Sequence, residues 1–161
     1  MPGLYFEDCK LGAVIRHALR RTVTEADNLL FSTLTHNPSP LHLDEEYMRN
    51  TEFGRRIVNS CFTLSLMTGV SVEDTTMGTA IANLGWEDAR FPGPVFHGDT
   101  LRIETEILNK RESKSRPDAG VVTFIHRAYN QHDELVGHCR RVALMKKRPT
   151  SEDQAASDFS A

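Results

Sequence analysis

Residues 58–69 read VNSCFTLSLMTG, and this stretch decides the fold. Apolar residues fall on more than one face of the helix that it predicts, and small Ser and Thr residues fill the other positions. This composition is typical of a helix that other elements surround. We therefore predict a buried central helix over these residues. Cys61 within it is expected to be a buried, inert thiol.

The sequence period changes after this helix. Between residues 101 and 107, Leu, Ile and Thr alternate with Arg and Glu, which indicates a half-buried strand. Two further β-rich runs, residues 121–129 and 135–145, flank a polar segment that suits a hairpin turn, so we expect them to pair antiparallel. Residues 13–23 and 80–91 are predicted to supply two more extended segments.

Two shorter helices are expected before the central one. Thr24 and Asp27 have the spacing of a capping box, and the residues behind them that recur at helical spacing are Ala26, Leu29, Leu30 and Leu34. Prolines at positions 38 and 40 end this helix, and Asp44 can cap a second, short one. Helices first and antiparallel strands later indicate an α+β domain with the long helix across one sheet.

Composition narrows the class of protein. The 161 residues are 39% hydrophobic and 25% charged, which suits one folded domain, predicted over residues 1–148. A C-terminal tail of small polar residues over 149–161 is expected to be disordered. The formal net charge of −3 provides no broad positive field, so we predict neither nucleic acid nor a membrane surface as a partner.

The cysteines and the first residues of the chain indicate the cellular compartment in which the protein works. Cys9, Cys61 and Cys139 are widely spaced, which supports neither a disulfide framework nor a structural zinc site. The chain begins MPGLYFEDCK, with acids where a signal peptide would be basic, and no apolar run reaches the length of a membrane-spanning helix. We therefore expect a cytoplasmic protein.

Residues 31–44, FSTLTHNPSPLHLD, resemble the signature loop of the MaoC-like, (R)-specific enoyl-CoA hydratase family. Residues 51–58, TEFGRRIV, and 95–101, VFHGDTL, resemble two further characteristic stretches in the same order. The resemblance covers about residues 4–147. It implies a hotdog fold, in which an antiparallel sheet wraps around a long central helix. It also implies a homodimer, or a multiple of one, that reversibly adds water across the double bond of an acyl-CoA.

The signature loop departs from the family pattern in one catalytic position. Family members usually carry Thr-Gly-Asp-x-Asn-Pro-x-His, which places Asn37 at the catalytic Asp and His42 at the catalytic His. Residues 36–42, 58–64 and 111–120 are similar to the subgroup that contains mesaconyl-CoA hydratases. That similarity implies a short, branched acyl-CoA with a second carboxylate, such as mesaconyl-CoA or itaconyl-CoA. Coenzyme A is then part of the substrate, and no separate cofactor is expected.

Hydration of an unsaturated thioester requires a base for water, an acid for Cα and donors to the thioester oxygen. His42 is the titrating group of the loop, whereas a neutral amide such as Asn37 only donates and accepts hydrogen bonds. Two arrangements therefore stay open. Either His42 does the acid–base work while Asn37 orients the water, or a carboxylate from elsewhere replaces the missing acid. The candidates for that carboxylate are Asp44, Glu87 and Asp88.

The resemblance also implies binding residues. It places the thioester oxygen at the start of the central helix, where free N–H groups favour negative charge, at Asn59, Ser60 and Cys61. The candidates for the phosphates of CoA are Arg55, Arg56, Lys114 and Arg116. A buried second carboxylate needs a cation, for which Arg90 is the first candidate and Arg55 the second. The spacing of His36 and His42 does not predict a metal site.

Two other functions stay open at this point. Hotdog domains also serve as thioesterases, but these generally use an acidic residue on the central helix, and residues 58–69 contain none. A non-catalytic acyl-CoA-binding subunit would explain the loss of the acid at Asn37. The presence of His42 argues against that alternative.

Overall fold

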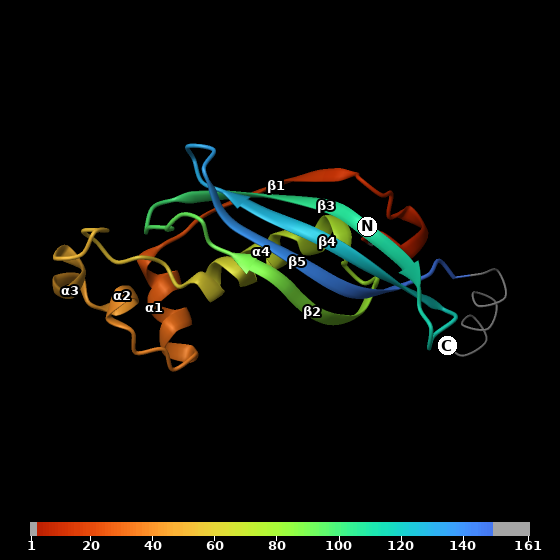
Figure 1. The fold of residues 1–161 in the computed structure, drawn as a ribbon, viewed down its shortest axis with the longest axis horizontal. Helices are drawn as coiled ribbons and strands as arrows, with labels where there is room; N and C mark the ends of the chain where they lie inside the picture. Colours follow the sequence, from red (N-terminus) through yellow and green to blue (C-terminus); the bar gives the residue numbers. More distant parts are fainter. Residues whose placement is uncertain (1–2, 150–161) are drawn as a thin grey trace, which may run out of the picture.

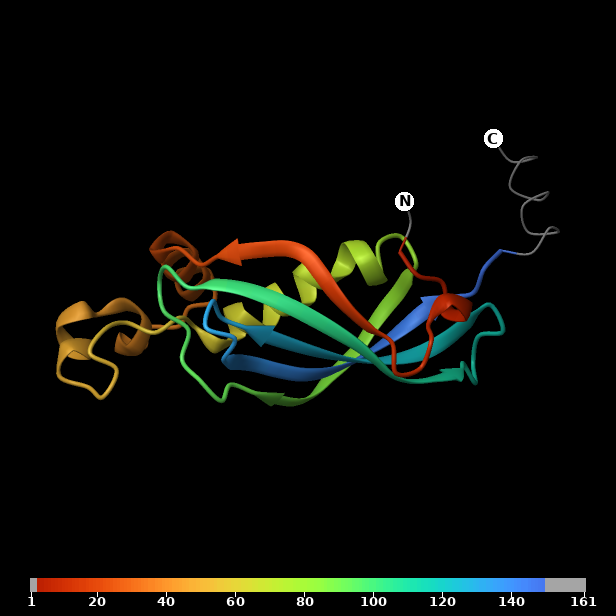
Figure 2. The ribbon, with the colours of Figure 1, turned by 90° about the horizontal axis from the view of Figure 1, so that it is seen from above.

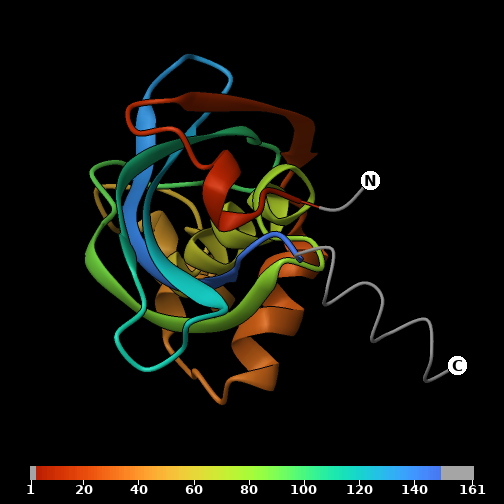
Figure 3. The same ribbon diagram turned by 90° about the vertical axis from the view of Figure 1, so that its right-hand side faces the viewer.

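A computed structural model of the chain describes residues 3–149. Its strands form one antiparallel sheet in the order β1-β3-β4-β5-β2, so β1 and β2 are the two edges. The strand bounds are β1 Val14–Thr22, β2 Ala80–Arg90, β3 Thr100–Glu112, β4 Ala119–Tyr129 and β5 Leu135–Lys146. The sheet curls around one long helix, α4, as the end-on view of Figure 3 shows. The predicted α+β architecture is confirmed.

The helices are η1 Phe6–Asp8, α1 Glu25–Leu34, α2 Pro40–Leu43, α3 Glu45–Arg49 and α4 Ser60–Thr75. Figure 1 shows α1, α2 and α3 grouped at one end of the sheet, whereas the turn between β3 and β4 lies at the other end. Figure 2 shows α4 lying along the sheet between these two ends. The segment before α4 is joined to residues 95 and 96, because Val58 N donates to Val95 O at 2.8 Å.

The strand positions and the antiparallel pairing of the last two strands are confirmed. In β3 the side chains of Leu101, Ile103, Thr105 and Ile107 are buried while those between them are partly exposed. This is the two-residue alternation of a strand with one covered face. The β4 and β5 strands pair antiparallel, with Val121 opposite Leu144 and Tyr129 opposite Leu135.

Helix α4 is buried on one side only. Thr63, Met67, Val70 and Ser71 face the sheet, and Gly137 of β5 permits this close packing, because a Cβ atom there would lie 3.0 Å from Met67 Sδ. The opposite side, which includes Cys61, is exposed. The expectation of a helix surrounded on all sides, with Cys61 buried, is therefore wrong. The described residues form a single sheet layer, which covers only one face of the helix.

Helix α1 begins with the predicted capping box, in which Asp27 N donates to Thr24 Oγ1 and Thr24 N donates to Asp27 Oδ2. This helix buries polar residues and exposes apolar ones, which is the opposite of an ordinary amphipathic helix. The fully buried residues are Asn28 and Ser32, whereas Leu30 is 61% exposed and Leu34 is 78% exposed. The inner side of α1 meets polar backbone groups of the loop that leads to α4, which explains why polar residues are buried there.

Within residues 3–149, no helix is both long and apolar enough to cross a membrane. The tail predicted at 149–161 lies outside the described residues, except for Pro149.

Candidate functional site

The predicted catalytic loop meets the start of α4 at the end of the sheet that carries α1, α2 and α3. A mainly apolar cavity of about 270 Å³ opens there. Its lining residues on the side of the loop and helix are Phe53, Ile57, Val58, Ser60 and Thr63. Residues 91–95 and Val136 line the other side.

His42 lies on the one-turn helix α2 and is half-buried. Its Nδ1 atom is 3.0 Å from the carbonyl oxygen of Ile57. Because a carbonyl only accepts, Nδ1 carries the proton, which leaves Nε2 as the basic nitrogen. Ile57 itself lines the cavity, so the imidazole is bonded to a residue of the cavity wall. This geometry suits a base that acts on a ligand in the cavity.

Asn37 lies in the turn after α1. Its Oδ1 atom accepts a hydrogen bond from Ser39 N at 3.0 Å, and its own N–H donates to Ser32 O at 2.9 Å. The side-chain carbonyl therefore fixes the Pro-containing turn with one of its two lone pairs. That this oxygen orients a water molecule stays a prediction.

The carboxylates that could replace the missing acid each have another partner. Asp44 caps α3, accepting from Tyr47 N at 2.9 Å. On β2, Glu87 pairs with Arg140 at 3.5 Å and Asp88 pairs with Arg90 at 2.6 Å. These contacts favour the arrangement in which His42 acts without a carboxylate partner.

The start of α4 leaves one of the three predicted amides available. Asn59 caps the helix, since its Oδ1 accepts from Cys61 N at 3.0 Å, and its own N–H donates to Asn28 Oδ1 at 2.9 Å. The Ser60 N–H has no acceptor within residues 3–149, and Ser60 lines the cavity. Ser60 is therefore the amide placed to receive a thioester oxygen.

Sequence reasoning missed Asn28 and His97. Asn28 is fully buried, and its Nδ2 atom lies 3.2 Å from both His42 O and Ile57 O and 3.0 Å from His97 Nε2. Burial lowers the pKa of His97, and the nearby Arg56 guanidinium lowers this pKa further. The available signal was Asn28 with Ser32, two polar residues one turn apart within an otherwise leucine-rich helix.

The two neighbouring arginines before α4 differ in their partners. Arg56 binds Glu25 at 2.6 Å and Glu45 at 2.7 Å, and these hydrogen bonds raise its pKa. It joins α1 to α3 rather than facing a ligand. Arg55 has no carboxylate partner within residues 3–149, and its guanidinium stacks 3.8 Å from the centroid of the Phe96 ring. It lines a second cavity of about 450 Å³, with both polar and apolar lining residues, that shares Pro92, Pro94 and Val136 with the apolar one.

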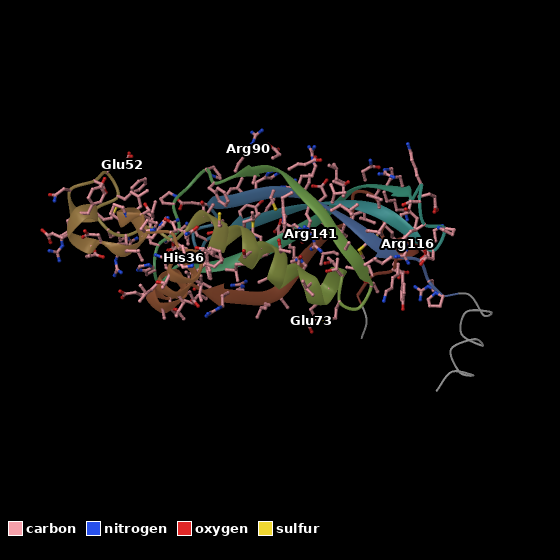
Figure 4. All side chains as sticks on the ribbon, turned by 90° about the horizontal axis from the view of Figure 1, so that it is seen from below. His36, Glu52, Glu73, Arg90, Arg116 and Arg141 are labelled. Atoms are coloured by element: carbon pink, nitrogen blue, oxygen red, sulfur yellow. The ribbon has the colours of Figure 1, made fainter. Side chains whose placement is uncertain are left out.

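The other predicted cations lie away from His42. Arg90 is 72% exposed in this chain and paired with Asp88, and it lines neither cavity, so these contacts do not favour it as the cation for a buried carboxylate. Its side chain projects away from the body of the molecule in Figure 4. Lys114 and Arg116 lie in the exposed turn between β3 and β4, and Arg116 binds Asp118 at 3.0 Å. Figure 4 shows Arg116 at the opposite end of the sheet from His36.

Within the part of the chain that the structure describes, no three His, Cys, Asp or Glu side chains are grouped as a metal site would require.

Comparison with known proteins places the chain in a family. The model of the MaoC like domain matches residues 8–130. Mesaconyl-CoA hydratase of Cereibacter sphaeroides is 34% identical over 149 residues, which are 92% of this chain and 43% of that relative. The chain thus spans less than half the length of this curated relative.

Two solved structures show the same fold. The MaoC-like dehydratase from Rhodospirillum rubrum is 32% identical with a TM-score of 0.80, over 92% of this chain and all of that chain. Rv0216 of Mycobacterium tuberculosis, described as a double hotdog fold, has a TM-score of 0.82 at 24% identity, over 91% of this chain and 45% of that chain. The fold is a hotdog, and the family match extends over more than half of the residues: the chain belongs to the MaoC-like domain family.

Proposed function

We propose that this protein is a hydro-lyase that adds water to, or removes it from, the double bond of an enoyl-CoA. One observation carries the proposal: Ser60, with a free amide, lines the apolar cavity, and His42 is bonded through Nδ1 to the carbonyl of Ile57, which lines the same cavity, so that Nε2 is left as a base. A base and an oxyanion donor beside an apolar cavity are what hydration of an unsaturated thioester requires.

In the hydration direction, His42 Nε2 takes a proton from water as the oxygen bonds to Cβ. Electrons of the double bond move to the thioester oxygen, where the Ser60 N–H stabilises the developing enolate charge. The imidazolium then gives its proton to Cα as the carbonyl re-forms. Dehydration follows the same path in reverse. Asn37 holds the water as a neutral hydrogen-bonding group. Either its side-chain nitrogen donates to the water, or the second lone pair of Oδ1 accepts from it.

The proposed substrate is a short, branched acyl group with a second carboxylate. The sequence resemblance and the similarity to a protein named mesaconyl-CoA hydratase support this choice. The apolar cavity suits a small branched chain. Arg55 lines the second cavity, which adjoins the apolar one, and it has no carboxylate partner within the described residues. A second carboxylate beside Arg55 would form the charge-assisted hydrogen bonds that its desolvation requires. Arg55 therefore replaces Arg90 as the proposed cation.

The proposed assembly is a homodimer or a multiple of one. Strand β2 is an unpaired edge of the described sheet with Leu84 53% exposed and Trp86 47% exposed, and an edge of this kind is a template for pairing with another chain. Antiparallel pairing of two β2 strands would set the β3–β4 turn of one copy beside the α1–α3 end of the other. Lys114 and Arg116 would then serve CoA bound by the second copy. The proposed location is the cytoplasm.

Thioester hydrolysis is less well supported. Helix α4 extends beyond the predicted segment and includes Glu73 and Asp74, but both lie in its last turns, and Asp74 is bonded to His17. No carboxylate lies in the first turn of α4, where the cavity is.

The test is a panel of CoA thioesters that includes mesaconyl-CoA, itaconyl-CoA, crotonyl-CoA and their hydrated products. Wild-type protein should convert at least one unsaturated thioester to its hydroxyacyl form, as read by loss of conjugated-thioester absorbance and by mass. Release of free CoA without hydration would support the thioesterase alternative. Binding without any conversion would support the non-catalytic subunit.

A further inference from the structure

We propose that Asn28 is a positioning residue of this site. It fixes the position of the basic nitrogen of His42 relative to the oxyanion donor at the start of α4. The inference rests on the proposed function and extends it to a residue that never touches substrate. It also explains why α1 buries an asparagine where helices of this kind bury leucine.

The contacts of Asn28 reach both halves of the site. Its amide nitrogen lies within hydrogen-bond distance of His42 O and Ile57 O, both at 3.2 Å. Its side-chain oxygen accepts from Asn59 N at 2.9 Å. One fully buried side chain thus joins the catalytic loop to the residue that caps α4.

The Ile57 carbonyl transmits this placement to the imidazole. It accepts from Asn28 Nδ2 and also lies 3.0 Å from His42 Nδ1. Because that carbonyl selects the His42 tautomer with Nδ1 protonated, fixing its position fixes both the direction and the chemical form of the basic Nε2. Asn59 in turn holds the first turn of α4, where the free Ser60 amide lies.

A primary amide suits these neighbours. Asn28 Nδ2 lies near two carbonyl oxygens and His97 Nε2, and its two hydrogens can serve two of these three at a time, while Oδ1 accepts from Asn59 N. A carboxylate would repel the carbonyl oxygens, and an apolar side chain would leave the buried N–H and carbonyl groups unpaired. Leu30 and Leu34 of α1 are exposed, and Phe31 packs edge-on against Phe62 of α4. That apolar contact joins the two helices but makes no hydrogen bond to the His42 or Ile57 carbonyl.

The test is Asn28→Asp, which keeps the shape and the acceptor for Asn59 N but removes both donor hydrogens. We expect kcat for hydration to fall by about 10- to 100-fold with KM within about threefold, because displacement of catalytic groups by an ångström has costs of this order. Ser32→Ala is the matched comparison, as Ser32 is fully buried one turn further along α1 and its hydroxyl contacts only the Asn59 side chain of the site. Its loss in kcat should be less than about threefold.

Acid should partly restore the Asn28→Asp variant. When the introduced carboxyl is protonated it regains one O–H donor, and burial favours that neutral form. The ratio of variant to wild-type kcat should therefore rise as pH is lowered from about 8 to about 6. A variant that is merely destabilised would instead lose activity towards acid, so a falling ratio would overturn the proposal.

A second readout does not depend on activity. Long-range ¹H–¹⁵N spectra of His42 should show a single Nδ1–H tautomer in the wild type and a mixture of tautomers in Asn28→Asp. If that variant does not fold, Asn28→Ser, which is smaller and cannot bridge the same groups, should show the same kcat loss and the same mixture.

An unchanged tautomer, or equal kcat losses in Asn28→Asp and Ser32→Ala, would refute the role of Asn28. Absence of hydration by the wild type with every thioester would refute the proposed function and leave the spectra to decide on Asn28.

Discussion

His17 Nδ1 lies 2.6 Å from Asp74 Oδ2, which ties the last turn of α4 to strand β1. The contact continues inward as a chain of buried hydrogen bonds. His17 Nε2 is 2.7 Å from Thr105 Oγ1, and Thr105 Oγ1 is 2.8 Å from His126 Nδ1. The chain crosses β1, β3 and β4 beneath the helix, at the opposite end of α4 from His42, so it fixes how the helix sits on the sheet.

His126 should make the fold sensitive to acid. Burial, helped by the charges of Arg141 and His17, lowers its pKa to about 3, below the value of about 6.5 expected in the unfolded chain. Between these values the unfolded state binds more protons, so stability present at neutral pH is lost as pH falls. We expect His126 to account for about 2 kcal/mol of lost unfolding free energy between pH 7 and pH 5.

The measurement is urea unfolding at both pH values for wild type and His126→Gln. The variant should show a smaller difference between the two pH values, even if it is less stable at both. Equal differences in the two proteins would mean that other groups cause the acid sensitivity.

His42→Ala should lower kcat for hydration by at least about 100-fold, because it removes the group that takes and returns the proton. Asn37→Ala should cost less if Asn37 only holds the water, and Asn37→Asp should stay active because it restores the family's usual group. Steady-state kinetics on folded proteins, with circular dichroism as the control for folding, separate these cases. Equal losses for the two alanine variants would show that His42 and Asn37 act as one unit.

Arg55→Met and Arg90→Met form a matched pair for substrate choice. Arg55→Met should reduce kcat/KM for mesaconyl-CoA at least about tenfold more than for crotonyl-CoA, because only the first substrate then holds an unpaired carboxylate. Arg90, which is exposed and paired with Asp88, should affect both substrates little. Equal losses on both substrates in Arg55→Met would assign Arg55 to the CoA portion instead.

Trp86→Lys should weaken the proposed β2 pairing, because it places a charge on an edge strand that now exposes an indole. Sedimentation of the wild type at micromolar concentration should give twice the mass of one chain or a multiple of it. The variant should shift towards the single-chain mass. A wild type that sediments as one chain would contradict the assembly.

Patterning predicted β3 well because this strand has one covered face, as the alternation around Ile103 shows. The end of α1 before the two prolines and the Asp44 cap of α3 were also predicted correctly, since both are defined locally. Burial was predicted poorly where tertiary contacts decide it. Helical spacing in α1 drew attention to leucines that proved exposed, and the partners of Arg56 and Arg90 come from residues that periodicity does not connect.

Helix α1 buries polar residues and exposes leucines, and this arrangement should affect both the folding of the protein and its local unfolding. Apolar burial drives collapse early and without direction, but a helix whose fully buried residues are Asn28 and Ser32 takes its final place when specific donors and acceptors meet. Its docking should therefore come late in folding, after α4 has settled on the sheet. The same helix should open at a lower free energy than the strands, giving faster amide hydrogen exchange over residues 25–34 than over β4.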